Sequence, residues 1–288
     1  GGAIDVGTPY APGTTTITGS TFTGNYAENY GGAVDADNQL SFDLSDSVFT
    51  ENTVLDSSGG GLFLEMVEEP SNATISNCTF EHNSSDYQGG GLDFQADRDA
   101  ILNIEDTSFG GNVSDYSGGA MRLTFTPTFV PEWASTVNLT RVMVSDNSAD
   151  VVGGGIKTSG KGYLNFDDCT LQGNIADDSG GAAINLANDT GATFTNCVID
   201  GNECLVSGGA IWCSGTLGVT LIDSAVTSNL GGGVGIHRDC SLVSENTDFG
   251  TGATDNDAYD VWMWEQDIYY SDYGAGESFA CEGTGECI

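Results

Sequence analysis

Residues 80–92 read FEHNSSDYQGGGL, and residues 109–121 read FGGNVSDYSGGAM. In both segments an apolar residue lies three positions before an asparagine, and a Gly-Gly step follows about six positions after it. The apolar-x-x-Asn element occurs at Phe22/Asn25, Phe49/Asn52, Phe80/Asn83, Phe109/Asn112, Val144/Asn147, Leu171/Asn174, Ile199/Asn202 and Val226/Asn229. Successive asparagines are 27, 31, 29, 35, 27, 28 and 27 residues apart. A repeat of this length is typical of a solenoid.

Other positions of the repeat are equally regular. Gly-Gly-small-apolar steps occupy residues 31–34, 59–62, 89–92, 118–121, 153–156 and 208–211, with looser versions at 180–183 and 231–234. Eight residues before each asparagine lies an apolar column, formed by Ile17, Leu44, Ile75, Ile104, Leu139, Phe166, Phe194 and Leu221. Apolar residues also stand two positions earlier in most repeats, and this period of two indicates a strand with one buried face.

The repeats predict an all-β fold, a right-handed parallel β-helix of about nine coils. A polar column that includes Asp46, Asn77 and Asp106 separates two strands, and these residue types tolerate a left-handed turn. Each repeat should therefore hold three short strands joined by sharp turns. A leucine-rich repeat would need a helical half, and a propeller blade would need a longer period. We expect repeats over residues 1–250 and a C-terminal capping segment over residues 251–288.

The Phe-x-x-Asn and Gly-Gly-Ala-Ile/Val/Leu motifs, with their paired spacing, resemble the repeats of the polymorphic outer membrane protein family. The resemblance covers about residues 1–250. It implies a surface-exposed β-helix used in adhesion. The chain departs from autotransporters in lacking amphipathic barrel strands, so the resemblance leaves the mode of anchoring open.

Composition limits the possible environment and partners. Forty-two acidic residues against six Lys+Arg give a net charge of −36, which should repel nucleic acid, anionic membranes and anionic polysaccharides. We find no transmembrane run, and we expect no direct membrane insertion by this segment. The eight cysteines favour an oxidising compartment, so we expect an extracellular or cell-surface location. Because the chain opens inside a repeat, we expect it to be a processed or excised piece.

The ladder asparagines, Asn25 to Asn229, should stack in the turns, where their amides hydrogen-bond along the ladder and cap corner carbonyls. The best disulfide candidates are Cys281 with Cys287 and, second, Cys213 with Cys240, with Cys204 as an alternative partner for either pair. Cys78, Cys169 and Cys197 share one column of small residues. We expect them to fill an inward ladder, although a bond between Cys169 and Cys197 is conceivable.

Acidic residues follow the ladder asparagines at a constant offset. The stripe includes Asp86, Asp115, Asp150 and Asp177, and stacked carboxylates repel one another unless they are solvated or bridged by a cation. A second group, Asp255, Asp257 and Asp260, has the oxygen density of a calcium loop without the register of an EF-hand. Both groups are candidate Ca²⁺ ligands, and a solvated acidic surface is the alternative.

Two segments are candidates for recognition. The longest coil contains Phe125, Phe129 and Trp133 in an excursion that could project and bind a partner or a glycan, or fold down over an apolar strip. The aromatic segment 261–273 is better explained as a cap on the last coil than as a binding site.

The function expected from these features is an extracellular structural or adhesive scaffold that binds a protein or glycan surface ligand and has no catalytic residues. Head-to-tail stacking of copies into a fibre is an additional possibility, because an uncovered parallel edge exposes unpaired amides and carbonyls. The alternative function is a polysaccharide lyase or glycoside hydrolase of the pectin-lyase-like fold. Such enzymes need clustered basic or acidic groups, whereas the six basic residues here are scattered over different coils.

Overall fold

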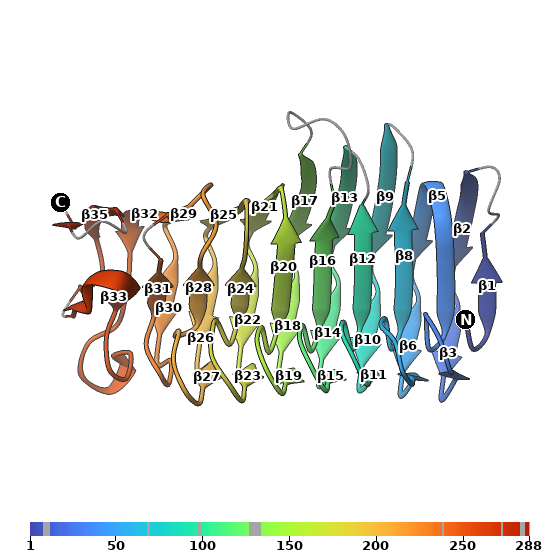
Figure 1. Ribbon diagram of the computed structural model, residues 1–288, viewed down its shortest axis with the longest axis horizontal. Coiled ribbons are helices and arrows are strands. Elements are labelled where there is room, and N and C mark those ends of the chain that lie inside the picture. The colour runs from blue at the N-terminus through green and yellow to red at the C-terminus, as the bar shows by residue number, and fades with distance from the viewer. Residues whose placement is uncertain are drawn as a thin grey trace.

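A computed structural model describes residues 1–7, 12–67, 70–96, 99–126, 134–237, 239–271, 273–282 and 286–287. The fold is the predicted all-β, right-handed parallel β-helix of about nine coils. Figure 1 shows the coils stacked along one axis, with the N-terminus at one end and the C-terminal segment at the other. In the described part of the chain, no helix is long and apolar enough to cross a membrane.

The strands of successive coils lie above one another in four columns. The first column follows the Gly-Gly steps and contains β1 (Ile4–Val6), β5 (Val34–Ser45), β8 (Leu62–Met66), β12 (Leu92–Ala96), β16 (Met121–Phe125), β20 (Ile156–Gly160), β24 (Ile184–Leu186), β28 (Ile211–Cys213), β31 (Val234–Ile236) and β33 (Val261–Met263). The second contains β2 (Gly13–Thr18), the end of β5, β9 (Ser71–Ser76), β13 (Ala100–Glu105), β17 (Ser135–Thr140), β21 (Gly162–Asp167), β25 (Thr190–Thr195), β29 (Val219–Ile222) and β32 (Ser241–Thr247).

The third column holds the apolar residue that precedes each ladder asparagine. Its members are β3 (Thr21–Thr23), β6 (Val48–Thr50), β10 (Thr79–Glu81), β14 (Ser108–Gly110), β18 (Met143–Ser145), β22 (Thr170–Gln172), β26 (Val198–Asp200) and β30 (Ala225–Thr227). The fourth consists of two-residue strands directly after the asparagines: β4 (Tyr26–Ala27), β7 (Thr53–Val54), β11 (Ser84–Ser85), β15 (Val113–Ser114), β19 (Ser148–Ala149), β23 (Ile175–Ala176) and β27 (Glu203–Cys204).

The fourth column differs from the expected three strands per repeat. Its inward residues are small and of mixed polarity, for example Val54, Ser85 and Ala149, each at most 1% exposed. Two residues of such varied types form no hydrophobic periodicity. Periodicity therefore could not predict this strand.

The core is a set of side-chain columns in strict register. The predicted interior stripe from Ile17 to Leu221 is confirmed, because each member pairs with the next across the ladders of the second column and is buried. In the third column, Phe22, Phe49, Phe80 and Phe109 stack with ring centroids 4.6–4.7 Å apart. Offset-stacked rings add specific attraction to the burial of their apolar surface.

The turns have the backbone conformations that the sequence predicts. Asp46, Asn77, Asp106 and their counterparts in later coils have φ values between +47° and +53°. At the Gly-Gly corner the constraint is close approach, because a Cβ at Gly90 would lie 2.3 Å from the Val113 carbonyl oxygen. Any larger residue there would push neighbouring coils apart.

The parallel coil continues beyond residue 250. β33 pairs with β31 in parallel, and only afterwards does the direction reverse, with β34 (Ile268–Tyr270) antiparallel to β33 and β35 (Glu277–Glu282) antiparallel to β32. The strand β36 (Glu286–Cys287) pairs with β35, and two short 3₁₀ turns, η1 (Gly252–Thr254) and η2 (Trp264–Gln266), complete this end. The first two strand columns thus end in the chain's own antiparallel strands.

Candidate functional site

The ladder asparagines stack in one unbroken column. Each interior amide accepts from the preceding asparagine, as when Asn112 Oδ1 accepts from Asn83 N and Nδ2 at 3.0 and 2.9 Å. Asn112 Nδ2 donates onward to Asn147 Oδ1 at 3.0 Å and back to the Phe80 carbonyl oxygen at 2.9 Å. From Asn52 to Asn229 these side chains are completely buried. The column is a structural element and offers no group to a ligand.

The later coils repeat the same geometry at Asn174 and Asn202. Asn174 Oδ1 accepts from Asn147 N and Nδ2 at 3.2 and 2.9 Å, and Asn202 Oδ1 accepts from Asn174 N and Nδ2 at 3.1 and 2.9 Å. Asn174 Nδ2 also donates to the Val144 carbonyl oxygen at 2.9 Å, and Asn202 Nδ2 donates to the Leu171 carbonyl oxygen at 3.0 Å. Both side chains are 0% exposed. Asn174 and Asn202 therefore join successive coils, and a ligand could not reach either amide.

The acidic stripe lies on the outside of one corner, and Asp86, Asp115, Asp150 and Asp177 are all exposed. Partial burial, with repulsion from Asp115 and Asp177, raises the pKa of Asp150 above its ordinary value. Repulsion between carboxylates of neighbouring coils thus contributes to the shift in second place, after burial. Among the described residues, no three His, Cys, Asp or Glu side chains come together closely enough to hold a metal ion.

The second acidic group is dispersed. Asn256 belongs to the amide ladder as its next member, since its Oδ1 accepts from Asn229 N and Nδ2 at 3.2 and 2.9 Å. Asp260 is buried and accepts from Asn256 Nδ2 and from the Tyr273 backbone N–H at 3.1 and 3.0 Å. Asp257 is exposed, and Asp255 is half-buried. Asp260 therefore stabilises the end of the coil, and it does not converge with Asp255 and Asp257 on a common point.

In the described residues, the longest coil offers no aromatic surface that a partner could contact. Phe125 ends β16 and is only 2% exposed, with its ring packed over Gly162, where a Cβ would lie 2.4 Å from it. Phe125 is a core residue and is not accessible to a partner, because the alternation along β16 directs its side chain inward. Phe129 and Trp133 lie outside the described residues.

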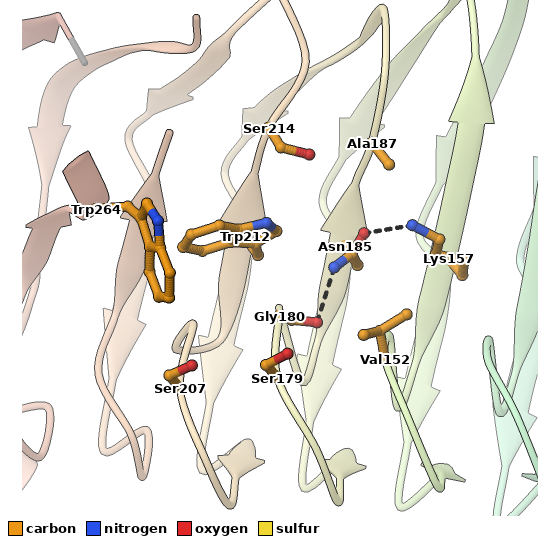
Figure 2. A pocket seen from close by; sticks show the side chains of 10 residues that line it. All are labelled: Val152, Lys157, Ser179, Gly180, Asn185, Ala187, Ser207, Trp212, Ser214 and Trp264. Carbon is orange, nitrogen blue, oxygen red and sulfur yellow. Dashed lines mark hydrogen bonds between the residues drawn. The ribbon is translucent and has the colours of Figure 1, made fainter. Parts of the chain in front are cut away.

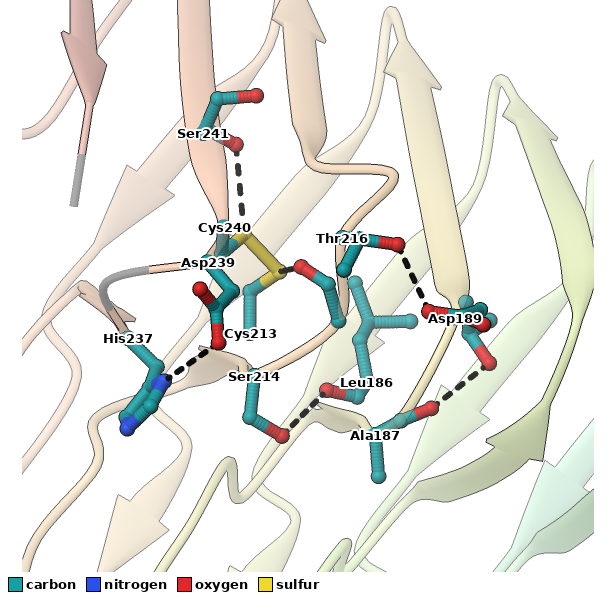
Figure 3. Close-up of a disulfide and its surroundings, with 12 residues drawn as sticks. Leu186, Ala187, Asp189, Cys213, Ser214, Thr216, His237, Asp239, Cys240 and Ser241 are labelled. Atoms are coloured by element: carbon teal, nitrogen blue, oxygen red, sulfur yellow. Dashed lines mark hydrogen bonds and ion pairs between the residues drawn. A yellow bond between two sulfur atoms is a disulfide. The ribbon is translucent and has the colours of Figure 1, made fainter.

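The predicted disulfides form as Cys213–Cys240 and Cys281–Cys287. Cys78, Cys169, Cys197 and Cys204 are buried free thiols. Cys169 Sγ accepts from the Val142 backbone N–H at 3.4 Å, so the thiol takes the place that a hydroxyl takes in other coils. Figure 3 shows the Cys213–Cys240 bond between adjacent coils, beside His237 and Asp239.

A cleft of about 320 Å³ opens on the outer face of the first strand column, over β20, β24 and β28. Lys157, Asn185 and Trp212 occupy the same outward position on these three strands and are paired in register. Figure 2 shows Lys157 at one end, Asn185 in the middle, and Trp212 with Trp264 at the other end. Ser179, Ser207 and Ser214 lie along the two sides.

The cleft holds a cation without a counter-charge. Lys157 Nζ donates to Asn185 Oδ1 at 2.6 Å, and no carboxylate in the described part of the chain forms an ion pair with it. Burial and then repulsion from Arg122 lower the pKa of Lys157 to about 8. Arg122 itself is paired with the fully buried Asp93, whose Oδ2 lies 3.1 Å from its Nη1, and burial raises the pKa of the Asp93 carboxyl group.

Two indole rings form the opposite wall. The rings of Trp212 and Trp264 lie 5.5 Å apart at 86°, and Trp264 is 42% exposed. Trp212 covers Gly235 on the next strand, where a Cβ would lie 2.6 Å from the ring. Trp264 begins η2, and His237 Nε2 lies 3.3 Å from Glu265 Oε1 on the same turn. This contact holds η2 against the last coil.

Comparison with known proteins agrees with this architecture. A family model described as a right-handed beta helix region matches residues 3–129 and 133–255, which is most of the chain. The chain belongs to the right-handed β-helix family. Neither a curated protein nor a solved structure matches it significantly.

Sequence reasoning did not identify the cleft of this right-handed β-helix. A signal was present, because Lys157 and Trp212 directly follow the Gly-Gly steps at 153–156 and 208–211, and Asn185 lies two residues after the looser step at 180–183. Following that position along the repeats would have placed the three side chains in one outward row. Trp264 carried no such signal, since it lies after the last parallel strand.

Proposed function

We propose that this β-helix is a noncatalytic extracellular scaffold that adheres to a glycan or protein surface. The observation that supports this proposal is the continuous amide ladder from Asn25 to Asn256, which fixes every coil to the next. Side chains held on such rigid strands keep their geometry when a ligand binds, so little conformational entropy is lost on binding. The two disulfides agree with an oxidising environment.

A glycoside hydrolase role receives less support from the cleft. Glycoside hydrolysis generally uses a pair of carboxyl groups on either side of the scissile bond. The ten residues that line the cleft offer one ammonium group, two indoles, hydroxyls and an amide. This set can bind and orient a ligand, and it contains no carboxylate to donate or accept a proton.

The direct test is retention of beads coated with the protein on an array of immobilised glycans and on cell surfaces. The proposal expects retention on a subset of glycans, with no new reducing ends or unsaturated products in the medium. Beads coated with heat-unfolded protein serve as the control. Release of cleaved products would favour the enzymatic alternative, and an absence of retention on every surface would contradict the scaffold.

A further inference from the structure

We infer that the cleft over β20, β24 and β28 binds a sugar ring bearing a single carboxylate, with Lys157 as its counter-charge and Trp212 and Trp264 as its stacking wall. The inference rests on the proposed function and names the ligand class for it.

The charge distribution points to an anionic group. The chain has a net charge of −36, yet the side chains lining this cleft include Lys157 and no acid. A half-buried ammonium group that donates to a neutral amide is held at a cost in desolvation. A carboxylate placed beside Lys157 Nζ would offset that cost through a charge-assisted hydrogen bond. Arg122 is paired with Asp93 and is not among the residues that line the cleft, so Lys157 is the cation that a ligand there would meet.

The aromatic wall points to a ring with an apolar face. Trp264 leaves 42% of its surface exposed although Trp262 packs beneath it with ring centroids 4.7 Å apart. The perpendicular arrangement of Trp212 and Trp264 gives a corner in which one indole presents its face and the other its edge. Such rigid aromatic surfaces contribute large contact area at a small cost in entropy.

Fixed polar groups lie between the two ends. Asn185 is buried, and its amide is oriented by Lys157 on one side and by the Gly180 carbonyl oxygen, 3.0 Å from Nδ2, on the other. Ser179 and Ser207 add hydroxyls along one edge. A pyranose has hydroxyls at its edge and C–H groups on its face, which suits this combination. A long polyanion would meet the acidic remainder of the surface, so one charged residue of an otherwise neutral glycan fits best.

The test is calorimetric titration of the folded protein with methyl β-D-glucuronide and with its neutral counterpart, methyl β-D-glucoside. We expect the glucuronide to bind at least tenfold more tightly. Lys157→Met should remove this preference, whereas Trp264→Ala should weaken the binding of both sugars at least tenfold. Lys161→Met, which deletes an equal charge on a residue that does not line the cleft, is the matched control and should bind like the wild type. Circular dichroism verifies that each variant is folded.

Equal affinity for the two sugars, or a preference that survives in Lys157→Met, would overturn the inference. So would an absence of glucuronide binding at millimolar concentration. Bead retention that neither Lys157→Met nor Trp264→Ala changes would also overturn this ligand assignment while leaving the scaffold function standing. An absence of bead retention on every surface would instead remove the function on which the inference rests.

Discussion

Replacing Asn112 by alanine should destabilise the β-helix by several kcal/mol, because this amide lies in the interior of the ladder. The change removes four hydrogen bonds of 2.9–3.0 Å made by a side chain that is 0% exposed. Two buried N–H groups, one on Asn83 N and one on Asn83 Nδ2, lose this acceptor, although Nδ2 keeps its hydrogen bond to the Phe49 carbonyl oxygen. Each orphaned buried group costs about 1–3 kcal/mol, so the expected loss is about 2–6 kcal/mol.

The matched control is Asn25→Ala, which makes the same substitution on the first ladder asparagine. Asn25 is only half-buried, and Asn52 Oδ1 would still accept from its backbone N–H at 3.0 Å. The expected cost there is about 1 kcal/mol. Urea unfolding of both variants, followed by circular dichroism, measures the difference. Equal destabilisation of the two variants would refute the claim that an asparagine inside the ladder stabilises the fold more than the one at its end.

Lys157→Met should raise stability at neutral pH by about 1–3 kcal/mol, since it removes an ammonium group whose pKa burial lowers to about 8. The unfolded chain binds this proton more tightly, so the free energy of unfolding of the wild type should rise between pH 8 and 10.5 relative to that of Lys157→Met. Melting temperatures of the two proteins that change in parallel across that pH range would contradict the lowered pKa of Lys157. Opening the Cys213–Cys240 bond, which closes a separation of 27 residues, should cost roughly 3–4 kcal/mol, measured by urea unfolding of the Cys213→Ala/Cys240→Ala variant. The acidic corner should make Ca²⁺ and Mg²⁺ equally stabilising at fixed ionic strength, because exposed repelling carboxylates gain from any divalent ion; a melting temperature raised by Ca²⁺ alone would indicate a specific site.

The repeat was predictable because its chemistry is local and periodic. A buried amide, an apolar residue three positions earlier and a glycine corner recur in every coil, so Asn25 to Asn229 identify the stack without any knowledge of long-range contacts. Asn256 was overlooked although it lies 27 residues after Asn229, because the flanking Asp255 and Asp257 suggested a calcium loop. The true role of Asn256 follows from register, and the acids beside it face elsewhere.

The cleft depends on information that the repeat does not contain. One column of the repeat contains Lys157, Asn185 and Trp212. Whether Lys157 can bind an anion depends on the charges around it, and sequence spacing does not show that Asp93 pairs with Arg122. Trp264 reaches the cleft through η2, whose path is set by antiparallel pairing and by the His237–Glu265 contact. The position of a residue such as Trp264, which lies beyond the repeats, is therefore the hardest to predict from sequence.

A crystal structure of the protein with methyl β-D-glucuronide tests the central claim most directly. The account predicts density for one sugar in the cleft, its ring against Trp264 and its carboxylate within hydrogen-bonding distance of Lys157 Nζ. An empty cleft at saturating ligand, or a sugar bound on a different face of the β-helix, would contradict it.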